Sequence, residues 1–226
     1  MSFITEFEKI SQTHQPVSKL FAQAGIPHGF LGYPSLPPND TLLMQQKHTI
    51  DIVEANQKTK PKIADGIVTK QPGLPIAVQT ADCVPLLISH PTHVAALHCG
   101  WRGTVAGMIK NYFQWLQKED LDFKKSLFVL GPAIFPPHYQ IQKDVFDAIQ
   151  TWCGPEITEL SVKREDDNHW QLNLSKAILY KLLQEGVPAE YMEWIRINTF
   201  SSPNFQSYRR DGSDAKRNYS WVQHVS

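Results

Sequence analysis

The chain contains 226 residues, of which 42% are hydrophobic and 19% are charged. The 22 basic and 22 acidic side chains balance, which argues against a protein built mainly to hold nucleic acid or a membrane surface. This apolar content supports a buried core and excludes a largely disordered chain. No apolar run is long enough to cross a bilayer, no secretory signal is visible, and three cysteines do not make a disulfide framework. We therefore expect a cytoplasmic globular protein.

The predicted elements follow from short apolar runs and proline or glycine boundaries. In chain order they are a helical stretch at 3–24 broken near Pro16, a proline-rich loop at 33–40, strands at 75–79, 85–89 and 93–98, a helix at 103–119, a strand at 126–130, a helix at 142–152, an extended segment at 170–174, a helix at 175–185 and a strand at 194–199. Helices and strands are mixed without strict alternation, which favours a mixed-sheet α/β or α+β fold. We interpret residues 1–226 as one domain.

A pair of metal-ligating side chains lies in the two central runs. If Pro91 and Thr92 form a hairpin turn, Pro85 lies opposite His98. Cys83 then shares a face with Pro85 and becomes a diagonal neighbour of His98, at about 7–8 Å. A metal held at about 2.3 Å from sulfur and about 2.0 Å from nitrogen would bridge this pair.

His48 is our candidate for a third ligand. Two histidines, one cysteine and an open position describe a catalytic zinc site or a copper site. Spacing alone leaves open that Cys83 is a small buried hydrophobic residue and that His48 and His98 are ordinary hydrogen-bonded histidines.

Charged residues surround these positions. Asp82 stands beside the thiol, and Arg102 lies where a glycine-flanked strand end turns into a helix, a place that attracts anions. Arg209 and Arg210 follow Tyr208, and such a combination suits an anionic or planar ligand. For the first motif the alternative is a tight turn in which Trp101 packs in the core and Arg102 is solvated, and for the last motif it is a solvated arginine pair.

Six stretches together resemble the laccase-domain family, also called polyphenol oxidase-like, whose members are described as purine nucleoside phosphorylases or peptidoglycan editing factors. In order along the chain they are Gln46-Lys47-His48, ADGIVT at 64–69, QTADCVP at 79–85, HCGWRGT at 98–104, GPAI at 131–134 and FQSYRRDG at 205–212. The resemblance implies a single α+β sandwich of mixed sheets with flanking helices.

The resemblance also implies ligands and chemistry. It assigns the metal to His48, Cys83 and His98, with zinc expected and copper as the alternative, and it brings Gln46 into the substrate site. The implied reactions are phosphorolysis of purine nucleosides and deamination of adenosine. For deamination, a zinc-activated water would attack C6 of adenine while a carboxylate moves the proton. The residues expected to act are Asp82 or Asp65 as the proton carrier, and Arg102, Arg209 and Arg210 as an anion clamp.

The sequence departs from the family pattern in three places. The segment before the Gln-x-His motif is shortened to the proline-rich loop, Asn198-Thr199 stands where Cys-Thr is usual, and Asp214-Ala215-Lys216 replaces Thr-Gly-Arg. Three competing functions also remain open. They are a copper-dependent oxidase of phenols, a hydrolase or peptidoglycan-editing amidase that uses the metal or Cys83 as nucleophile with His98 as base, and a non-enzymatic metal-holding module.

Overall fold

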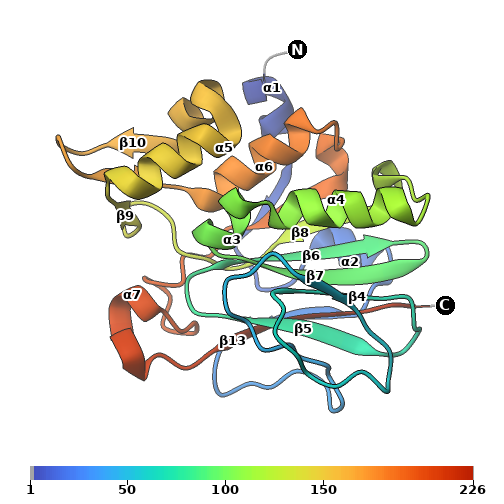
Figure 1. Cartoon of the computed structure of the whole chain (residues 1–226). Helices are drawn as coiled ribbons and strands as arrows, with labels where there is room; N and C mark the ends of the chain where they lie inside the picture. Colours follow the sequence, from blue (N-terminus) through green and yellow to red (C-terminus); the bar gives the residue numbers. More distant parts are fainter. Residues whose placement is uncertain (1–2, 226) are drawn as a thin grey trace.

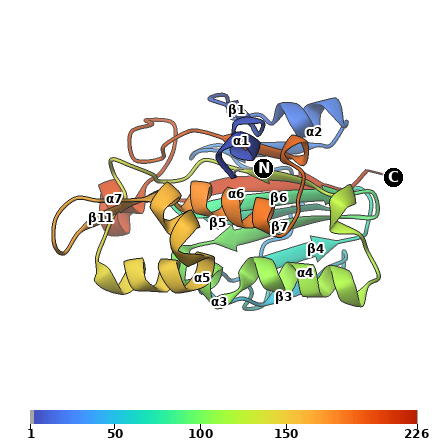
Figure 2. The same cartoon turned by 90° about the horizontal axis from the view of Figure 1, so that it is seen from above.

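The computed structural model describes residues 3–225 and has three layers (Figure 1). A seven-stranded mixed sheet with strand order β1-β12-β8-β6-β7-β4-β3 forms the middle layer. Helices cover one face of this sheet, and a three-stranded sheet, β2-β13-β5, covers the other. Viewed from the helical side, α4, α5 and α6 lie in front of the sheet and run roughly along the strands (Figure 2). This confirms the predicted sandwich of mixed sheets with flanking helices.

The elements have the following bounds. The central sheet contains β1 (Ser11–Thr13), β3 (Ile52–Glu54), β4 (Gly66–Thr69), β6 (Val84–His90), β7 (His93–Cys99), β8 (Leu127–Leu130) and β12 (Met192–Ile195). The covering sheet contains β2 (His28–Leu31), β5 (Pro75–Thr80) and β13 (Asn218–Gln223), and a small third sheet contains β9 (Gln140–Ile141), β10 (Val162–Arg164) and β11 (Trp170–Leu172). The helices are α1 (Phe3–Glu8), α2 (Lys19–Gln23), α3 (Trp101–Ala106), α4 (Met108–Lys118), α5 (Lys143–Ser161), α6 (Leu174–Gln184) and α7 (Tyr208–Asp211).

The central strands are buried on both faces, and their side chains divide between two cores. Leu86 and Leu97 belong to the core beneath the helices, whereas Leu87 and Ala96 belong to the core between the two sheets. This division follows from the two-residue period of a strand, which sends successive side chains to opposite faces. Because both faces are covered, these strands are continuous apolar runs in the sequence.

The β6–β7 hairpin has the predicted register. His90 pairs with His93 and Pro85 pairs with His98 in an antiparallel ladder. Strand β4 pairs with the other edge of β7, and Asp65, directly before β4, accepts the backbone N–H of His98 through its carbonyl. The start of β6, the end of β7 and the start of β4 therefore meet at one end of these central strands.

Four predicted elements differ from the structure. The N-terminal helical stretch is interrupted by β1, because residues 11–13 pair in parallel with β12. The helix expected at 103–119 is two helices, since Gly107 between α3 and α4 has a left-handed backbone with φ of 115°. The helix expected at 142–152 is α5, which continues to Ser161 past a kink at Gly154. The strand expected at 194–199 begins earlier and ends at Ile195. In the first case a long-range pairing overrode local helical propensity.

Among residues 3–225, the helices are all too short or too polar to cross a bilayer.

Replacement of a central core residue should destabilise the chain strongly. Leu97 is fully buried in β7, so Leu97→Ala is expected to lower the free energy of unfolding by about 2–5 kcal/mol through lost transfer energy and a residual cavity. Leu36→Ala is the control, because Leu36 is 70% exposed and its loss should cost under about 0.5 kcal/mol. Denaturant unfolding monitored by tryptophan fluorescence measures both values. Equal costs for the two variants would contradict this description of the core.

Candidate metal centre

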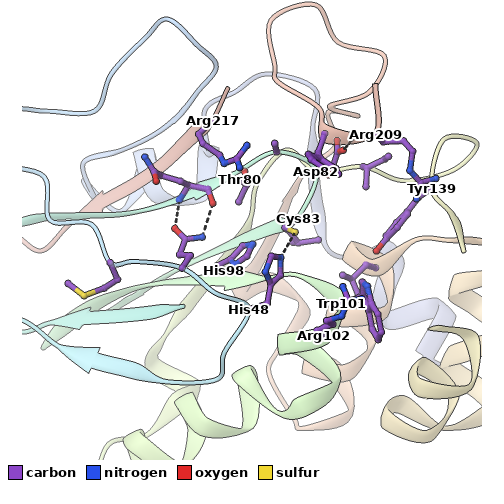
Figure 3. A pocket seen from close by; sticks show the side chains of 18 of the residues that line it. His48, Thr80, Asp82, Cys83, His98, Trp101, Arg102, Tyr139, Arg209 and Arg217 are labelled. Atoms are coloured by element: carbon purple, nitrogen blue, oxygen red, sulfur yellow. Dashed lines mark hydrogen bonds between the residues drawn. The ribbon is translucent and has the colours of Figure 1, made fainter. Parts of the chain in front are cut away.

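His48, Cys83 and His98 converge where the ends of β4, β6 and β7 lie together (Figure 3). One ligand atom from each residue lies within 4.8 Å of the other two, and Cys83 Sγ is 3.9 Å from His48 Nε2. Cys83 lies directly before β6, His98 lies in β7, and His48 comes from a loop that precedes β3. One thiolate and two imidazoles at this separation fit a borderline divalent ion such as Zn²⁺ or Cu²⁺.

Asp65 holds two of the three ligands in place from behind. Its side chain is fully buried and accepts five hydrogen bonds. One oxygen accepts His98 Nδ1–H at 2.6 Å and the backbone N–H of His48 at 2.9 Å. The other accepts the backbone N–H groups of Lys47 and Thr49 and the Thr49 hydroxyl. Asp65 thereby fixes the His98 tautomer that presents Nε2 to the site, and it anchors the loop that carries His48.

The electrostatics of the cluster favour a charged pair in the metal-free protein, namely a Cys83 thiolate beside a protonated His98. Burial alone would raise the pKa of Cys83, but hydrogen bonds from His48 and His98 lower it to about 6. Burial alone would lower the pKa of His98, but its bonds to Asp65 and Cys83 raise it to about 9. Burial alone would raise the pKa of Asp65, but hydrogen bonds from His98 and from the backbone of Lys47 and Thr49 lower it. Near pH 7 the site therefore holds a thiolate, which is the form that ligates metals.

Two residues of the site have unusual backbones. His48 has φ of 59° and Asp82 has φ of 88°, a left-handed region that costs energy for residues other than glycine. At His48, the hydrogen bond from its backbone N–H to the Asp65 carboxylate offsets this cost. At Asp82, the carboxylate accepts the Thr199 hydroxyl at 2.6 Å and the Arg209 N–H at 2.7 Å. These bonds tie the position of Cys83, the next residue, to the distant segment that begins α7.

The cluster lies in a pocket of about 720 Å³ (Figure 3). Its charged lining, apart from the histidines, consists of Asp82 and the guanidinium groups of Arg102, Arg209 and Arg217. Aromatic side chains of Trp101, Tyr139 and Tyr208 line it as well. The excess of positive charge favours an anionic ligand.

The predicted substrate residues occupy different places. Arg102 and Arg209 line the pocket, although the Arg209 guanidinium also donates to the carbonyls of His138 and Gln140. Gln46 lines the pocket too, but its amide forms both hydrogen bonds with the backbone of Gln79. Its amide is therefore engaged in holding the 45–50 loop against β5.

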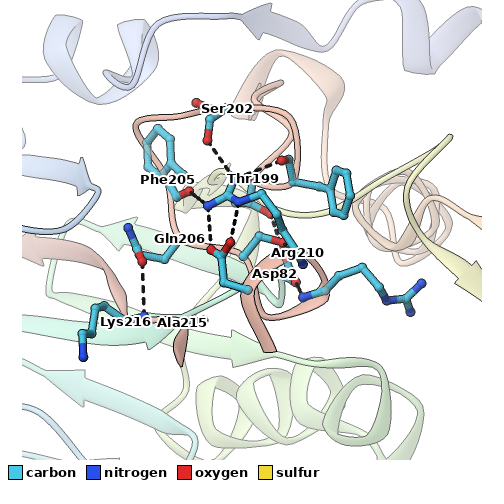
Figure 4. A network of polar contacts seen from close by, with 12 residues as sticks. Asp82, Thr199, Ser202, Phe205, Gln206, Arg210, Ala215 and Lys216 are labelled. Carbon is cyan, nitrogen blue, oxygen red and sulfur yellow. Dashed lines mark hydrogen bonds and ion pairs between the residues drawn. The ribbon is translucent and has the colours of Figure 1, made fainter. Parts of the chain in front are cut away.

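The structure does not bring Arg210 to the pocket (Figure 4). Its guanidinium forms an ion pair with Asp211 and donates to carbonyl oxygens of the 199–205 loop, at Thr199, Phe200, Ser202 and Phe205. The Arg210 guanidinium thus holds the 199–205 loop together by donating to four of its carbonyl oxygens. Since Thr199 in the same loop holds Asp82, Arg210 supports the site from a distance.

Sequence reasoning missed Arg217 and Tyr139. Arg217 lies just beyond the position where the family pattern places its Thr-Gly-Arg, so a one-residue shift in that comparison could have found it. Tyr139 follows the matched stretch at 131–134 by five residues and carried no pattern of its own. Only the path of the chain between β8 and β9 brings it to the pocket.

Residues 31–224 match the family model described as "Multi-copper polyphenol oxidoreductase laccase". The chain belongs to this family. The family predicted from the sequence motifs is thereby confirmed.

Curated relatives in this family carry another name. A purine nucleoside phosphorylase of Bacteroides thetaiotaomicron is 31% identical over 68% of this chain and 58% of its own length. The purine nucleoside phosphorylase YlmD of Bacillus subtilis is 30% identical over 73% of this chain and 60% of its own length. The aligned part of the chain therefore spans about three fifths of these relatives. The crystal structure of YlmD from Geobacillus stearothermophilus superposes with a TM-score of 0.77, at 25% identity, covering 83% of this chain and 74% of that one.

Gly100→Ala should weaken metal binding without unfolding the chain. A Cβ at this position would lie 2.8 Å from His48 Cδ2 and 3.1 Å from Cys83 Sγ, so the ligands must move apart. The backbone itself, with φ of −68°, accepts alanine. We expect metal affinity to fall about tenfold or more, as when an outer partner of a ligand is lost.

The control for this variant is Gly73→Ala. Gly73 has open space around its Cα but φ of 78°, so alanine costs about 1 kcal/mol of backbone strain and touches no ligand. Metal titration and thermal unfolding of both variants separate the two effects. Unchanged metal affinity in Gly100→Ala would show that the three ligand atoms do not share one ion.

Metal affinity should rise with pH. Binding requires a neutral His98 and a Cys83 thiolate, and the pKa values are about 9 and about 6 in the metal-free protein. Between these values one proton leaves His98 on binding, so the affinity should increase about tenfold per pH unit and level off above pH 9. Competition with a chelating dye from pH 6 to 10 measures this slope. A metal affinity that does not change with pH would contradict the pairing of a Cys83 thiolate with a protonated His98.

Proposed function

We propose that the chain is a metal-dependent purine nucleoside phosphorylase, a transferase whose substrates are a purine nucleoside and inorganic phosphate. The observation that carries the proposal is one pocket in which the His48–Cys83–His98 cluster lies beside three guanidinium groups. The names of the curated relatives support it, since both aligned proteins are called purine nucleoside phosphorylases. We propose zinc as the metal, because one thiolate and two imidazoles form an ordinary zinc donor set.

The arginines are suited to the two electron-rich partners of this reaction. In phosphorolysis a phosphate oxygen bonds to C1′ of the sugar as the bond from C1′ to the purine nitrogen breaks. The purine takes the electron pair, together with the proton that hydrogen phosphate brings. Arg102, Arg209 and Arg217 form none of the ion pairs found among residues 3–225, so their charges are available to the phosphate and the departing purine.

The two carboxylates position other groups in this proposal. Asp65 is buried and already accepts five hydrogen bonds, and Asp82 has both oxygens bonded to Thr199 and Arg209. Neither arrangement suits the proton carrier that deamination of adenosine requires. We therefore propose phosphorolysis as the principal reaction, with Asp65 orienting the histidines and Asp82 fixing Cys83 and the start of α7.

A divalent ion at His48, Cys83 and His98 would supply a Lewis acid to an oxygen of the substrate. The chain's own residues supply the rest: the arginines bind the anionic groups, and the aromatic side chains of the pocket exclude water from the base. A four-electron oxidation by several coppers finds no support in the ligand set, because residues 3–225 contain one cluster of three potential ligands.

One observation favours a second candidate, thiol-dependent hydrolysis. Asp65 bonds His98 Nδ1, and His98 in turn lies against the Cys83 thiolate, which is the order of groups in a cysteine nucleophile with an oriented base. An amidase acting on cell-wall precursors would use this arrangement. It differs from the first proposal in a measurable way, since its activity would survive metal removal and be lost on alkylation of Cys83.

Phosphorolysis is tested with metal-replete protein, nucleosides and phosphate. We expect release of free purine and ribose 1-phosphate, dependence on phosphate, and loss of activity by at least about a hundredfold in Cys83→Ala, because a ligand of the metal is removed. Liquid chromatography measures the products, and elemental analysis measures the metal in both proteins. The matched control is Cys153→Ala, which removes a buried thiol of α5, outside the pocket.

The proposal fails if metal-replete wild type releases no purine. It also fails if Cys83→Ala keeps its full metal content and activity. Phosphate-independent cleavage that persists after chelation would instead favour the thiol hydrolase.

A further inference from the structure

Asn198 stands at a departure from the family pattern, where Asn-Thr replaces Cys-Thr. Its side chain is buried and does not line the pocket. The carboxamide bonds to the backbone at both ends: Nδ2–H donates to the Phe135 carbonyl at 2.8 Å, and Oδ1 accepts the Phe200 N–H at 3.1 Å. A thiol, by contrast, is a weak donor and a weak acceptor on a single atom. Asn198 therefore links the segment after β8 (131–140) to the segment after β12 (197–210).

Further contacts join the same two segments. The backbone of Ala133 is hydrogen-bonded to the backbone on either side of Asn198. The ring of His138 stacks on the ring of Phe200, with the two centroids 4.3 Å apart. The Arg209 guanidinium, in the second segment, donates to two carbonyl oxygens of the first. The two linked segments therefore behave as one unit, and the Asn198 carboxamide is the side chain that bonds to both.

This unit holds the residue that precedes Cys83. From the first segment, the Ile134 N–H donates to the Asp82 carbonyl at 3.0 Å. From the second, the Thr199 hydroxyl and the Arg209 N–H donate to the Asp82 carboxylate. Asp82 has a left-handed backbone with φ of 88°, a conformation that persists where surrounding contacts fix it. The position of Cys83 therefore depends on the spacing of the two linked segments.

We propose that Asn198 is a positioning residue for the metal ligand Cys83. Its carboxamide fixes the spacing of two segments that both bond to Asp82, and this spacing holds the thiol within reach of the two imidazoles. Asn198 acts through Thr199, the next residue, whose hydroxyl bonds to the Asp82 carboxylate at 2.6 Å. The inference rests on the proposed metal centre and is independent of the reaction that the pocket performs.

Cobalt(II) binding to the full chain tests this role, because the sulfur-to-cobalt charge-transfer band depends on how the thiolate meets the ion. Asn198→Ala removes both hydrogen bonds of the carboxamide. We expect its cobalt affinity to fall about tenfold, as when an outer partner of a metal ligand is lost, and the charge-transfer band to weaken. Asn198→Asp keeps the acceptor for the Phe200 N–H and removes only the donor to Phe135, and it should change both quantities in the same direction.

The matched control is Thr69→Val. The Thr69 hydroxyl is also buried, donates to the Ala55 carbonyl and accepts the Gln71 N–H, but it lies at the end of β4 away from the ligand cluster. This variant loses stability through the same kind of bonds, and its cobalt affinity should change less than about twofold. An equal loss of cobalt affinity in Thr69→Val and Asn198→Ala would show a general effect of stability and overturn the inference.

A double-mutant cycle with Thr199→Val tests the route from Asn198 to the thiol. Thr199→Val removes the hydroxyl that bonds to Asp82. If Asn198 acts through this bond, the double variant should lose less than about twofold more cobalt affinity than Thr199→Val alone. Losses that multiply in the double variant would show that the two residues act independently, and would overturn the inference.

Hydrogen exchange in the metal-free protein gives a readout that needs neither metal nor turnover. The Arg209 N–H is bonded to the Asp82 carboxylate, so its exchange should be about tenfold faster in Asn198→Ala and unchanged in Thr69→Val. Unchanged exchange together with unchanged cobalt affinity in Asn198→Ala would overturn the inference. A wild type that binds no cobalt would overturn the proposed metal centre, whereas faster exchange at Arg209 would still support the hold of Asn198 on Asp82.

Discussion

One buried carboxylate organises the candidate centre. Asp65 lies directly before β4, where the pairing of β4 with β7 places it opposite His98. Its two oxygens then orient the His98 ring and gather three successive backbone N–H groups of the loop that carries His48. A burial of this kind is costly for an unpaired charge, and the five hydrogen bonds offset that cost. Without them the left-handed backbone of His48 would have no support.

The third ligand depends on a different set of contacts. Cys83 follows Asp82, whose strained backbone is held by Thr199 and by the first turn of α7. Arg210 in turn closes the 199–205 loop. The C-terminal segment therefore sets the place of the thiol, although it is more than a hundred residues away in the sequence. Ligand geometry and the shape of the pocket are coupled through this segment, because Arg209 and Arg217 belong to it.

The family name and the site describe different chemistries. The family is described as a multi-copper oxidoreductase, yet residues 3–225 bring together one group of three ligands. The pocket that contains this group is cationic and aromatic, and the curated relatives at 30–31% identity are called purine nucleoside phosphorylases. A shared fold does not determine activity, so the arginines and the ligand cluster are the features of this chain that favour the proposed phosphorolysis.

The sequence by itself predicted the mixed-sheet fold class and the register of the β6–β7 hairpin, and its resemblance to the family implied the three converging residues. These depend on local patterns: apolar runs, a two-residue turn and short motifs. It did not determine β1, which exists because β12 lies beside it, nor the functions of Asp65, Gln46 and Arg210, whose side chains are engaged within the protein. It also missed Tyr139 and Arg217. Whether a polar group faces a ligand or a neighbouring backbone depends on which distant segments pack against it, and only the tertiary structure decides that.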